Sequence, residues 1–197
     1  MITLAEADIQ DITPKVEITD AGASFANELT GERMQLTPER SIEIQNRLGA
    51  DIIMAFDECT PYPATFEQAA SGVRRTLAWM RRCVAAHARA HDQALFGIVQ
   101  GSVYPQLREQ CAAALVAMDL PGYAIGGVSV GEGHELLCRV TAHAAPLLPE
   151  DRPRYLMGVG TPEDLVTGVE NGMDMFDCVL PTRTARTGRL YTNEGVL

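Results

Sequence analysis

Residues 94–127 read ALFGIVQGSVYPQLREQCAAALVAMDLPGYAIGG and contain one complete strand–helix–strand unit. The runs Ala94–Gln100 and Tyr123–Gly127 have the length and apolar content of buried strands. Between them, Tyr104–Met118 predicts a helix, with a proline at its first turn. A helix that joins two near-continuous apolar strands is typical of a parallel sheet. This stretch therefore indicates an α/β fold.

The same unit recurs on both sides of this stretch. Further strands are predicted at Asp51–Asp57, Arg154–Val159 and Met173–Val179. Helices are predicted from Thr37 to near Gly49, over about 66–91, over 132–145, and after the Thr161-Pro162 cap. We expect about five parallel strand–helix units over residues 37–197. Residues 1–36 are expected to form an N-terminal arm or hairpin, with strand-like segments at Val16–Phe25 and Glu28–Leu36.

Polar residues or glycines follow each predicted strand: Asp57, Gln100, Gly126-Gly127, Gly158 and Asp177. In (β/α)8 barrels the active site lies at the carboxyl ends of the strands, so this placement favours a barrel over an open sheet. A complete barrel has about 250 residues. We therefore expect one incomplete (β/α)8 TIM-barrel domain over residues 1–197.

Composition limits the class of protein. The chain of 197 residues is 46% hydrophobic, which excludes wholesale disorder. Its formal charge of −10 argues against a surface that binds nucleic acid along its whole length. No apolar run reaches the length of about 18 residues typical of a membrane helix, and the acidic N-terminus lacks signal-peptide features. We expect a cytoplasmic protein whose five cysteines, which form no CxxC pair, are free thiols.

The strand-end residues are candidates for chemistry. Asp57 and Asp177 could each act as nucleophile, general base or hydrogen-bond acceptor, or could cap the next loop. The amide of Gln100 can donate and accept, which suits the edge of a planar base, but it could equally bond a loop. Gly126 and Gly127 allow either a close backbone approach to a ligand or a tight turn.

Three further features have two interpretations each. Met157 could pack on a flat ligand or fill the core. The arginines of PTRTARTGR could meet phosphates or lie in a solvated loop; they are Arg183, Arg186 and Arg189. A helical stripe could bind a metal, but no fourth ligand is evident, so we expect a surface feature and no metal site; it comprises Cys83, His87 and His91.

Five motifs, in order and with matching spacing, resemble the tRNA-guanine transglycosylases. They are DIIMAFDECTPYPA (51–64), FGIVQG (96–101), YAIGGVSVGE (123–132), YLMGVGTPEDL (155–165) and MFDCVLPTRTARTG (175–188). The segment LTPERSIEIQNRLGAD (36–51) fits the family upstream of the first motif. The resemblance covers nearly the whole chain.

The resemblance implies a (β/α)8-barrel pentosyltransferase of queuosine tRNA modification. Such an enzyme exchanges the wobble guanine of GUN-anticodon tRNAs for a 7-deazaguanine by double displacement. Asp177 falls on the nucleophile, which attacks C1′ of the ribose. The positions assigned to the base are Asp57 at its N–H edge, Gln100 and the Gly127 N–H (with neighbouring Gly126) at its carbonyl, Cys59 in the pocket wall and Met157 against its face. The three arginines fall where the family contacts tRNA.

The pocket pattern resembles the bacterial branch of the family. Val128 and Val130 are bulkier than glycine, and Val130 is expected to narrow the pocket. We therefore expect 7-aminomethyl-7-deazaguanine as the incoming base rather than queuine. Ser102 follows Gln100-Gly101 where a second glycine is usual; serine is small, so the effect is expected to be slight.

Two family features are absent from this sequence. One is the upstream Asp-Ser-Gly-Gly-Phe-Gln motif with the expected acid/base aspartate. The other is the Cys-x-Cys-x2-Cys…His site for Zn2+, so no cofactor is expected in this chain. An alternative is therefore a truncated or non-catalytic chain that binds base or tRNA without turnover. A glycoside hydrolase using Asp57 and Asp177 is a weaker alternative. The family commonly forms dimers, which leaves the oligomeric state open.

Overall fold

The computed structural model describes residues 16–192 and 194–197. The acidic N-terminal stretch that argued against a signal peptide lies outside this range. At the centre is a sheet of five strands in the order β4-β5-β6-β7-β8. Every neighbouring pair is parallel. The strands are β4 (Ile52–Met54), β5 (Ala94–Val99), β6 (Gly122–Ile125), β7 (Arg154–Leu156) and β8 (Met175–Phe176).

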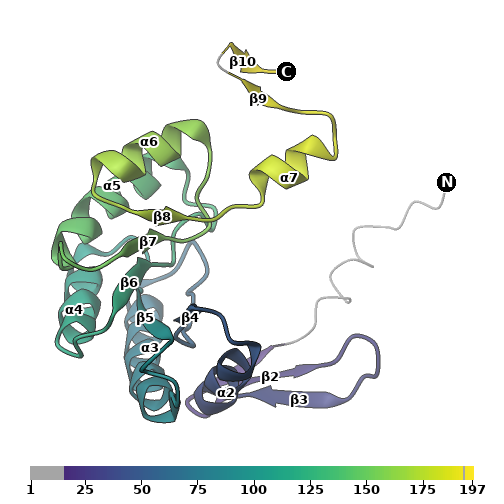
Figure 1. Cartoon of the computed structure of the whole chain (residues 1–197), viewed down its shortest axis with the longest axis vertical. Helices are drawn as coiled ribbons and strands as arrows, with labels where there is room; N and C mark the ends of the chain where they lie inside the picture. The colour runs from purple at the N-terminus through teal and green to yellow at the C-terminus, as the bar shows by residue number, and fades with distance from the viewer. Residues whose placement is uncertain (1–15, 193) are drawn as a thin grey trace.

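The sheet curls into a half-barrel with its helices packed along the outer side (Figure 1). The helices are α2 (Pro38–Leu48), α3 (Phe66–Ala86), α4 (Pro105–Val116), α5 (His134–Ala144) and α6 (Pro162–Glu170), with the 3-10 turn η1 (Ala145–Leu147) after α5. Successive helices contact one another in chain order. This arrangement confirms the predicted partial (β/α)8 barrel.

Threonine caps begin three of the helices, and two of them, Thr37 and Thr161, were predicted. The side chains of Thr37, Thr65 and Thr161 each accept a hydrogen bond from the backbone N–H three residues later. The predicted extension of the second helix to residue 91 is wrong, because α3 ends at Ala86. Beyond it, Arg89 donates to the Asn46 carbonyl and forms an ion pair with Asp92, which turns the chain toward β5.

The N-terminal arm has three antiparallel strands instead of the two expected segments. They are β1 (Glu17–Thr19), β2 (Gly22–Ala26) and β3 (Arg33–Leu36), paired in that order. The predicted strand 16–25 divides at Asp20-Ala21, because α3 holds this turn. The indole of Trp79 donates to the Asp20 carbonyl at 2.9 Å, and Arg82 donates to the carbonyls of both turn residues.

The core lies between the sheet and the helices. Phe96, Ile125 and Leu156 of the strands are at most 1% exposed. Phe56 stacks on the buried Trp79 ring, with centroids 4.8 Å apart. All five cysteines are free thiols, as predicted. Within the described residues, no helix combines the length and the apolar character needed to cross a bilayer.

The C-terminal segment leaves the half-barrel after β8 (Figure 1). It contains the short helix α7 (Leu180–Ala185) and an antiparallel hairpin of β9 (Tyr191–Thr192) and β10 (Gly195–Val196). The sequence patterns predict neither element, because this segment has no buried residue in its helix or strands to produce a periodic pattern.

Candidate active site

A first group of predicted residues meets where β4, β5 and β6 end. The Gln100 amide nitrogen donates to Asp57 Oδ2 at 2.6 Å. Gln100 is 2% exposed, and its amide oxygen is buried without a hydrogen-bond partner among the described residues. A buried unpaired oxygen destabilises the fold by roughly 1–3 kcal/mol unless a ligand supplies a donor. This pair can therefore present both donor and acceptor atoms to a planar ligand.

The paired glycines make room for the Gln100 side chain. A Cβ on Gly126 would lie 2.8 Å from the Gln100 amide nitrogen, and one on Gly127 would lie 2.3 Å from its oxygen. Gly127 also has a φ of +63°, which favours glycine. Any larger residue at these positions would displace the amide that contacts Asp57.

Two residues of this first group, Asp57 and Cys59, have raised pKa values. Burial raises the pKa of Asp57, and the hydrogen bond from Gln100 opposes that rise. Cys59 is at an exposed position. Loss of hydration around its thiol and the neighbouring Asp57 charge raise the pKa of Cys59, while the Gly127 N–H opposes the rise. The Cys59 thiol is therefore protonated at neutral pH and poorly suited to be a nucleophile.

Arg108 of α4 holds the ends of β5 and β6 together, and sequence analysis missed it. The side chain is 1% exposed. Its guanidinium donates to four backbone carbonyls at 2.8–3.1 Å, those of Val99, Ser102, Gly126 and Gly127. Burial lowers the pKa of Arg108 to about 10, so the group stays charged at neutral pH.

The spacing of residues along α4 could have identified Arg108 as a buried residue. It shares the buried side of α4 with Leu107, Cys111, Ala112 and Leu115. An arginine at a core position of an amphipathic helix needs buried acceptors, and strand-end carbonyls provide them. Ser102, one of these acceptors, has a φ of +51°. That conformation explains why glycine suits this position.

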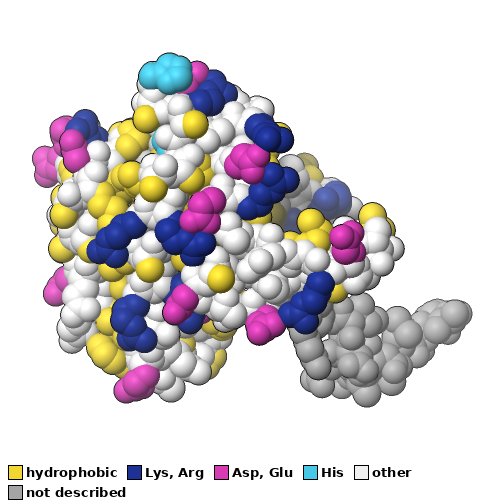
Figure 2. Space-filling view, turned by 90° about the horizontal axis from the view of Figure 1, so that it is seen from below, with side chains coloured by type: hydrophobic (Ala, Val, Ile, Leu, Met, Phe, Trp, Pro, Cys, Tyr) yellow, Lys and Arg dark blue, Asp and Glu magenta, His cyan; other side chains and the backbone are white. Residues whose placement is uncertain are grey.

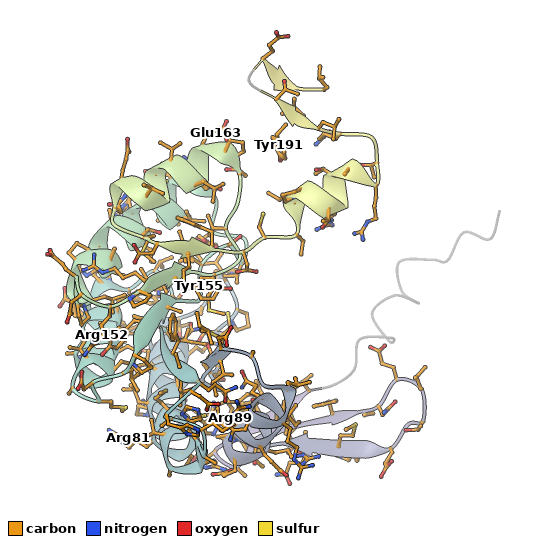
Figure 3. All side chains as sticks on the ribbon, viewed as in Figure 1. Arg81, Arg89, Arg152, Tyr155, Glu163 and Tyr191 are labelled. Carbon is orange, nitrogen blue, oxygen red and sulfur yellow. The ribbon has the colours of Figure 1, made fainter. Side chains whose placement is uncertain are left out.

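A second group surrounds Asp177, just after β8. Asp177 Oδ1 accepts hydrogen bonds from the hydroxyl of Tyr155 on β7 (Figure 3) at 2.6 Å and from the Gly158 N–H at 2.8 Å. Among the described residues, none donates to Oδ2. Burial and then the Asp177 carboxylate raise the pKa of Tyr155, so its hydroxyl remains a donor. Asp177 itself is exposed, which leaves its second oxygen accessible.

The loop after β7 connects the two groups. Met157 is half-buried, and its N–H donates to the Ile125 carbonyl of β6 at 3.2 Å. A Cβ on Gly158 would lie 3.8 Å from Cβ of Ser129, so the loops after β6 and β7 touch. Met157, a predicted site residue, thus lies between the glycine pair and Gly158, whose N–H orients Asp177. Val130, which was expected to narrow the pocket, is 38% exposed.

The three arginines lie apart from these groups. Arg183 is within α7, Arg186 caps it, and Arg189 follows. All three are exposed. In the described part of the chain, none of them forms an ion pair. They form a basic segment next to the strand that carries Asp177.

The zinc-binding motif of the family has no counterpart in the residues present. The five cysteines are at positions 59, 83, 111, 138 and 178, which is not the Cys-x-Cys-x2-Cys pattern. The Cys83, His87 and His91 stripe does not assemble either. Cys83 is buried and accepts a hydrogen bond from the Phe56 N–H, whereas the His91 side chain is 78% exposed.

The fold and the strand-end carboxylates define a partial (β/α)8 barrel with a polar site at its carboxyl edge. A model of the queuine tRNA-ribosyltransferase family matches residues 3–197. Relatives called queuine tRNA-ribosyltransferase include one from Bacillus mycoides, 57% identical over 180 residues, and one from Geobacillus kaustophilus, 56% identical over 178 residues. These alignments cover 91% and 90% of this chain but 48% and 47% of the relatives.

The chain therefore belongs to the queuine tRNA-ribosyltransferase family. It spans about half the length of the curated relatives that it matches.

Proposed function

We propose that this chain carries the nucleophile and most of the base pocket of a cytoplasmic tRNA-guanine transglycosylase. The observation that carries the proposal is the orientation of Asp177. Two donors hold its Oδ1, from Tyr155 and Gly158, and its Oδ2 projects from an exposed strand end. A carboxylate held by one oxygen presents the other in a fixed direction, as nucleophilic displacement requires.

The first displacement forms a covalent tRNA. Asp177 Oδ2 attacks C1′ of the ribose at the wobble position, and the bond from C1′ to N9 of guanine breaks. The electron pair of that bond stays on N9, which then takes a proton from a general acid. The family resemblance assigns that acid to an aspartate in the Asp-Ser-Gly-Gly-Phe-Gln motif, which is not part of this sequence. The residues described here supply the nucleophile and its orientation.

The second displacement installs the new base. The incoming 7-deazaguanine gives the proton on its N9 to the conjugate base of that same general acid. Its N9 then attacks C1′, and the bond from C1′ to Asp177 breaks and releases the carboxylate. Asp57 accepts from the N–H edge of either base, Gln100 and the Gly127 N–H bind the carbonyl, and the Met157 side chain packs on the ring face. The 2.6 Å contact of Asp57 with Gln100 supports this assignment, because it brings acceptor and donor to one edge.

Radiolabelled guanine exchange into unmodified GUN-anticodon tRNA tests this proposal. Exchange is measured with this chain and with a longer protein extended to the full length of its relatives. In whichever protein exchanges guanine, Asp177→Asn is expected to lower the rate at least ~1,000-fold and to abolish the covalent tRNA adduct. Asp174→Asn is the matched control, because Asp174 lies at the opposite end of β8 and bonds the Arg154 N–H. That variant is expected to keep the rate within a few fold.

Exchange by the longer protein alone supports the alternative that this chain binds without turnover. Asp177 would then be the nucleophile of the longer protein. Inactivity of both lengths as folded proteins contradicts the enzyme. A covalent adduct that persists in Asp177→Asn contradicts the assignment of Asp177 as the nucleophile. The choice of base is tested in the same assay by competing 7-aminomethyl-7-deazaguanine with queuine. We propose that the aminomethyl base is preferred; a clear preference for queuine contradicts this assignment.

A further inference from the structure

A cluster of three side chains joins the first turns of α5 and α6, outside the site described above. His134 is the first residue of α5, and Cys138 lies one turn later on the same side. Asp164 is in the first turn of α6. One potential ligand atom from each residue lies within 4.8 Å of the others. The family resemblance assigns no role to these residues, and their sequence pattern differs from the zinc motif.

The distances in this cluster are close to those of a metal site. The Nδ1 nitrogen of His134 lies 2.6 Å from Asp164 Oδ1 and 3.8 Å from the Cys138 sulfur, so one imidazole nitrogen faces both of the other ligand atoms. Tetrahedral Zn2+ with bonds of 2.0–2.3 Å holds its ligand atoms roughly 3.3–3.7 Å apart. An ion would therefore replace the hydrogen bond between His134 and Asp164 after a shift of about 1 Å.

The surroundings restrain two of the three ligands. The Asp164 side chain is only 12% exposed, and its own N–H bonds the Thr161 cap, which fixes its position on α6. Cys138 is half-buried, with the hydroxyl of Thr167 beside its sulfur. His134 is 60% exposed, which leaves a route for an ion from solvent. Glu163, labelled in Figure 3, marks this end of α6.

We propose that His134, Cys138 and Asp164 bind a divalent transition-metal ion of the Zn2+ type. A nitrogen, a thiolate sulfur and a carboxylate oxygen favour Zn2+ over Mg2+ or Ca2+, which prefer oxygen ligands alone. Three protein ligands leave one coordination position for water. The ion would join α5, which follows the loop of Gly126 and Gly127, to α6, which follows the loop of Met157 and Gly158. Its role is to fix these two loops against each other.

Cobalt titration of the chelator-treated chain tests the site, with Co2+ as a coloured probe. We expect one equivalent to bind, with the visible absorption of a tetrahedral ion and a thiolate-to-cobalt charge-transfer band that Zn2+ abolishes by displacement. Cys138→Ser should remove the charge-transfer band, and His134→Ala and Asp164→Asn should each weaken binding at least about tenfold. Cys59→Ser and His91→Ala, which change exposed residues outside the cluster, should leave the titration unchanged.

Alkylation provides a second measurement that needs no variant. Bound Zn2+ should slow the reaction of Cys138 with iodoacetamide at least about tenfold and leave the rate at exposed Cys59 unchanged, as mapped by mass spectrometry. Zn2+ should also raise the Tm of the chain, because an ion that binds only the native state stabilises it. Absence of stoichiometric binding at millimolar Co2+, or a charge-transfer band that survives in Cys138→Ser, overturns the proposal.

Discussion

Asp57 and Asp177 occupy equivalent ends of parallel strands but have opposite surroundings. Asp57 is half-buried, accepts from Gln100, and has a raised pKa. Asp177 is exposed and is held through one oxygen by Tyr155. A half-buried carboxylate beside an amide suits recognition of a ligand edge, whereas an exposed, oriented carboxylate suits attack on a sugar carbon. The environment of each residue therefore separates roles that strand-end position alone left equivalent.

Replacing Asp57 by Asn is expected to stabilise the fold while it weakens base binding. Because the folded pKa of Asp57 is raised, the native state holds its proton at pH values where the unfolded chain has already released it. Asp57 therefore lowers the free energy of unfolding as pH rises from its ordinary pKa of 3.8 through the raised value. Asn keeps an acceptor for Gln100 and has no charge to bury.

Urea unfolding of Asp57→Asn and the parent chain measures this effect. We expect the variant to be more stable by about 1 kcal/mol at pH 7, with the difference shrinking toward pH 4. Guanine affinity should fall roughly 10- to 100-fold at pH 7, because the N–H edge of the base loses its charged acceptor. A variant that is less stable at pH 7 than at pH 4, relative to the parent, contradicts the buried-carboxylate interpretation.

At the scale of elements, α4 determines how the ends of two strands are held. Its Arg108 donates hydrogen bonds to backbone carbonyls at the ends of β5 and β6. The same backbone carries the Gln100 amide and the glycine pair. Strand ends in a parallel sheet leave carbonyl groups without ladder partners, and a five-donor guanidinium can satisfy several at once. The first group of site residues thus depends on a helix that contributes no ligand-binding residue.

Arg108→Met is expected to destabilise the chain by more than about 3 kcal/mol. The carbonyls of Ser102, Gly126 and Gly127 lose their donor, and that of Val99 keeps only the Gly126 N–H. Arg139→Met is the matched control: Arg139 lies on neighbouring α5 and lines a surface cavity together with Arg108, but it is exposed. That change should stay within about 0.5 kcal/mol. Chemical denaturation of both variants provides the comparison, and equal effects would show that the carbonyl contacts contribute little.

At the scale of the whole molecule, the sequence predicts those features of the fold and the site that depend on the periodicity of apolar residues and on where strands end. The five parallel units and the placement of Asp57 and Gln100 at one edge of the sheet follow from alternating apolar strands and helices. The hydrogen bonds of Arg108 and the contact of Tyr155 with Asp177 could not be predicted from these patterns. Each joins residues on different elements and depends on the direction in which a side chain points. The turn at Asp20 was missed for the same reason: Trp79, 59 positions away, fixes it.

Within the described residues, some arginines form ion pairs and others do not. Figure 2 views the end that carries α2 and α3 and shows basic and acidic side chains interspersed. On α2, Arg40 and Arg47 both pair with Glu43, and on the arm Arg33 pairs with Glu17. The arginines of the α7 segment form no such pairs within the described residues, so they retain their full charge for phosphates. A chain of charge −10 can thus still present one basic segment beside Asp177.

Replacing Arg183, Arg186 and Arg189 together by Gln is therefore expected to weaken tRNA binding specifically. Each phosphate contact adds about 0.7–0.9 to the slope of log affinity against log salt, so the variant should lose about 2 to 3 from that slope. The control replaces Arg33, Arg40 and Arg47 by Gln and removes the same three charges from paired positions. Fluorescence anisotropy with an anticodon stem-loop, at several salt concentrations, measures both. If the control reduces the slope equally, the effect is one of net charge and the α7 segment is not the contact; if only the α7 variant does, local unpaired charge determines where tRNA binds.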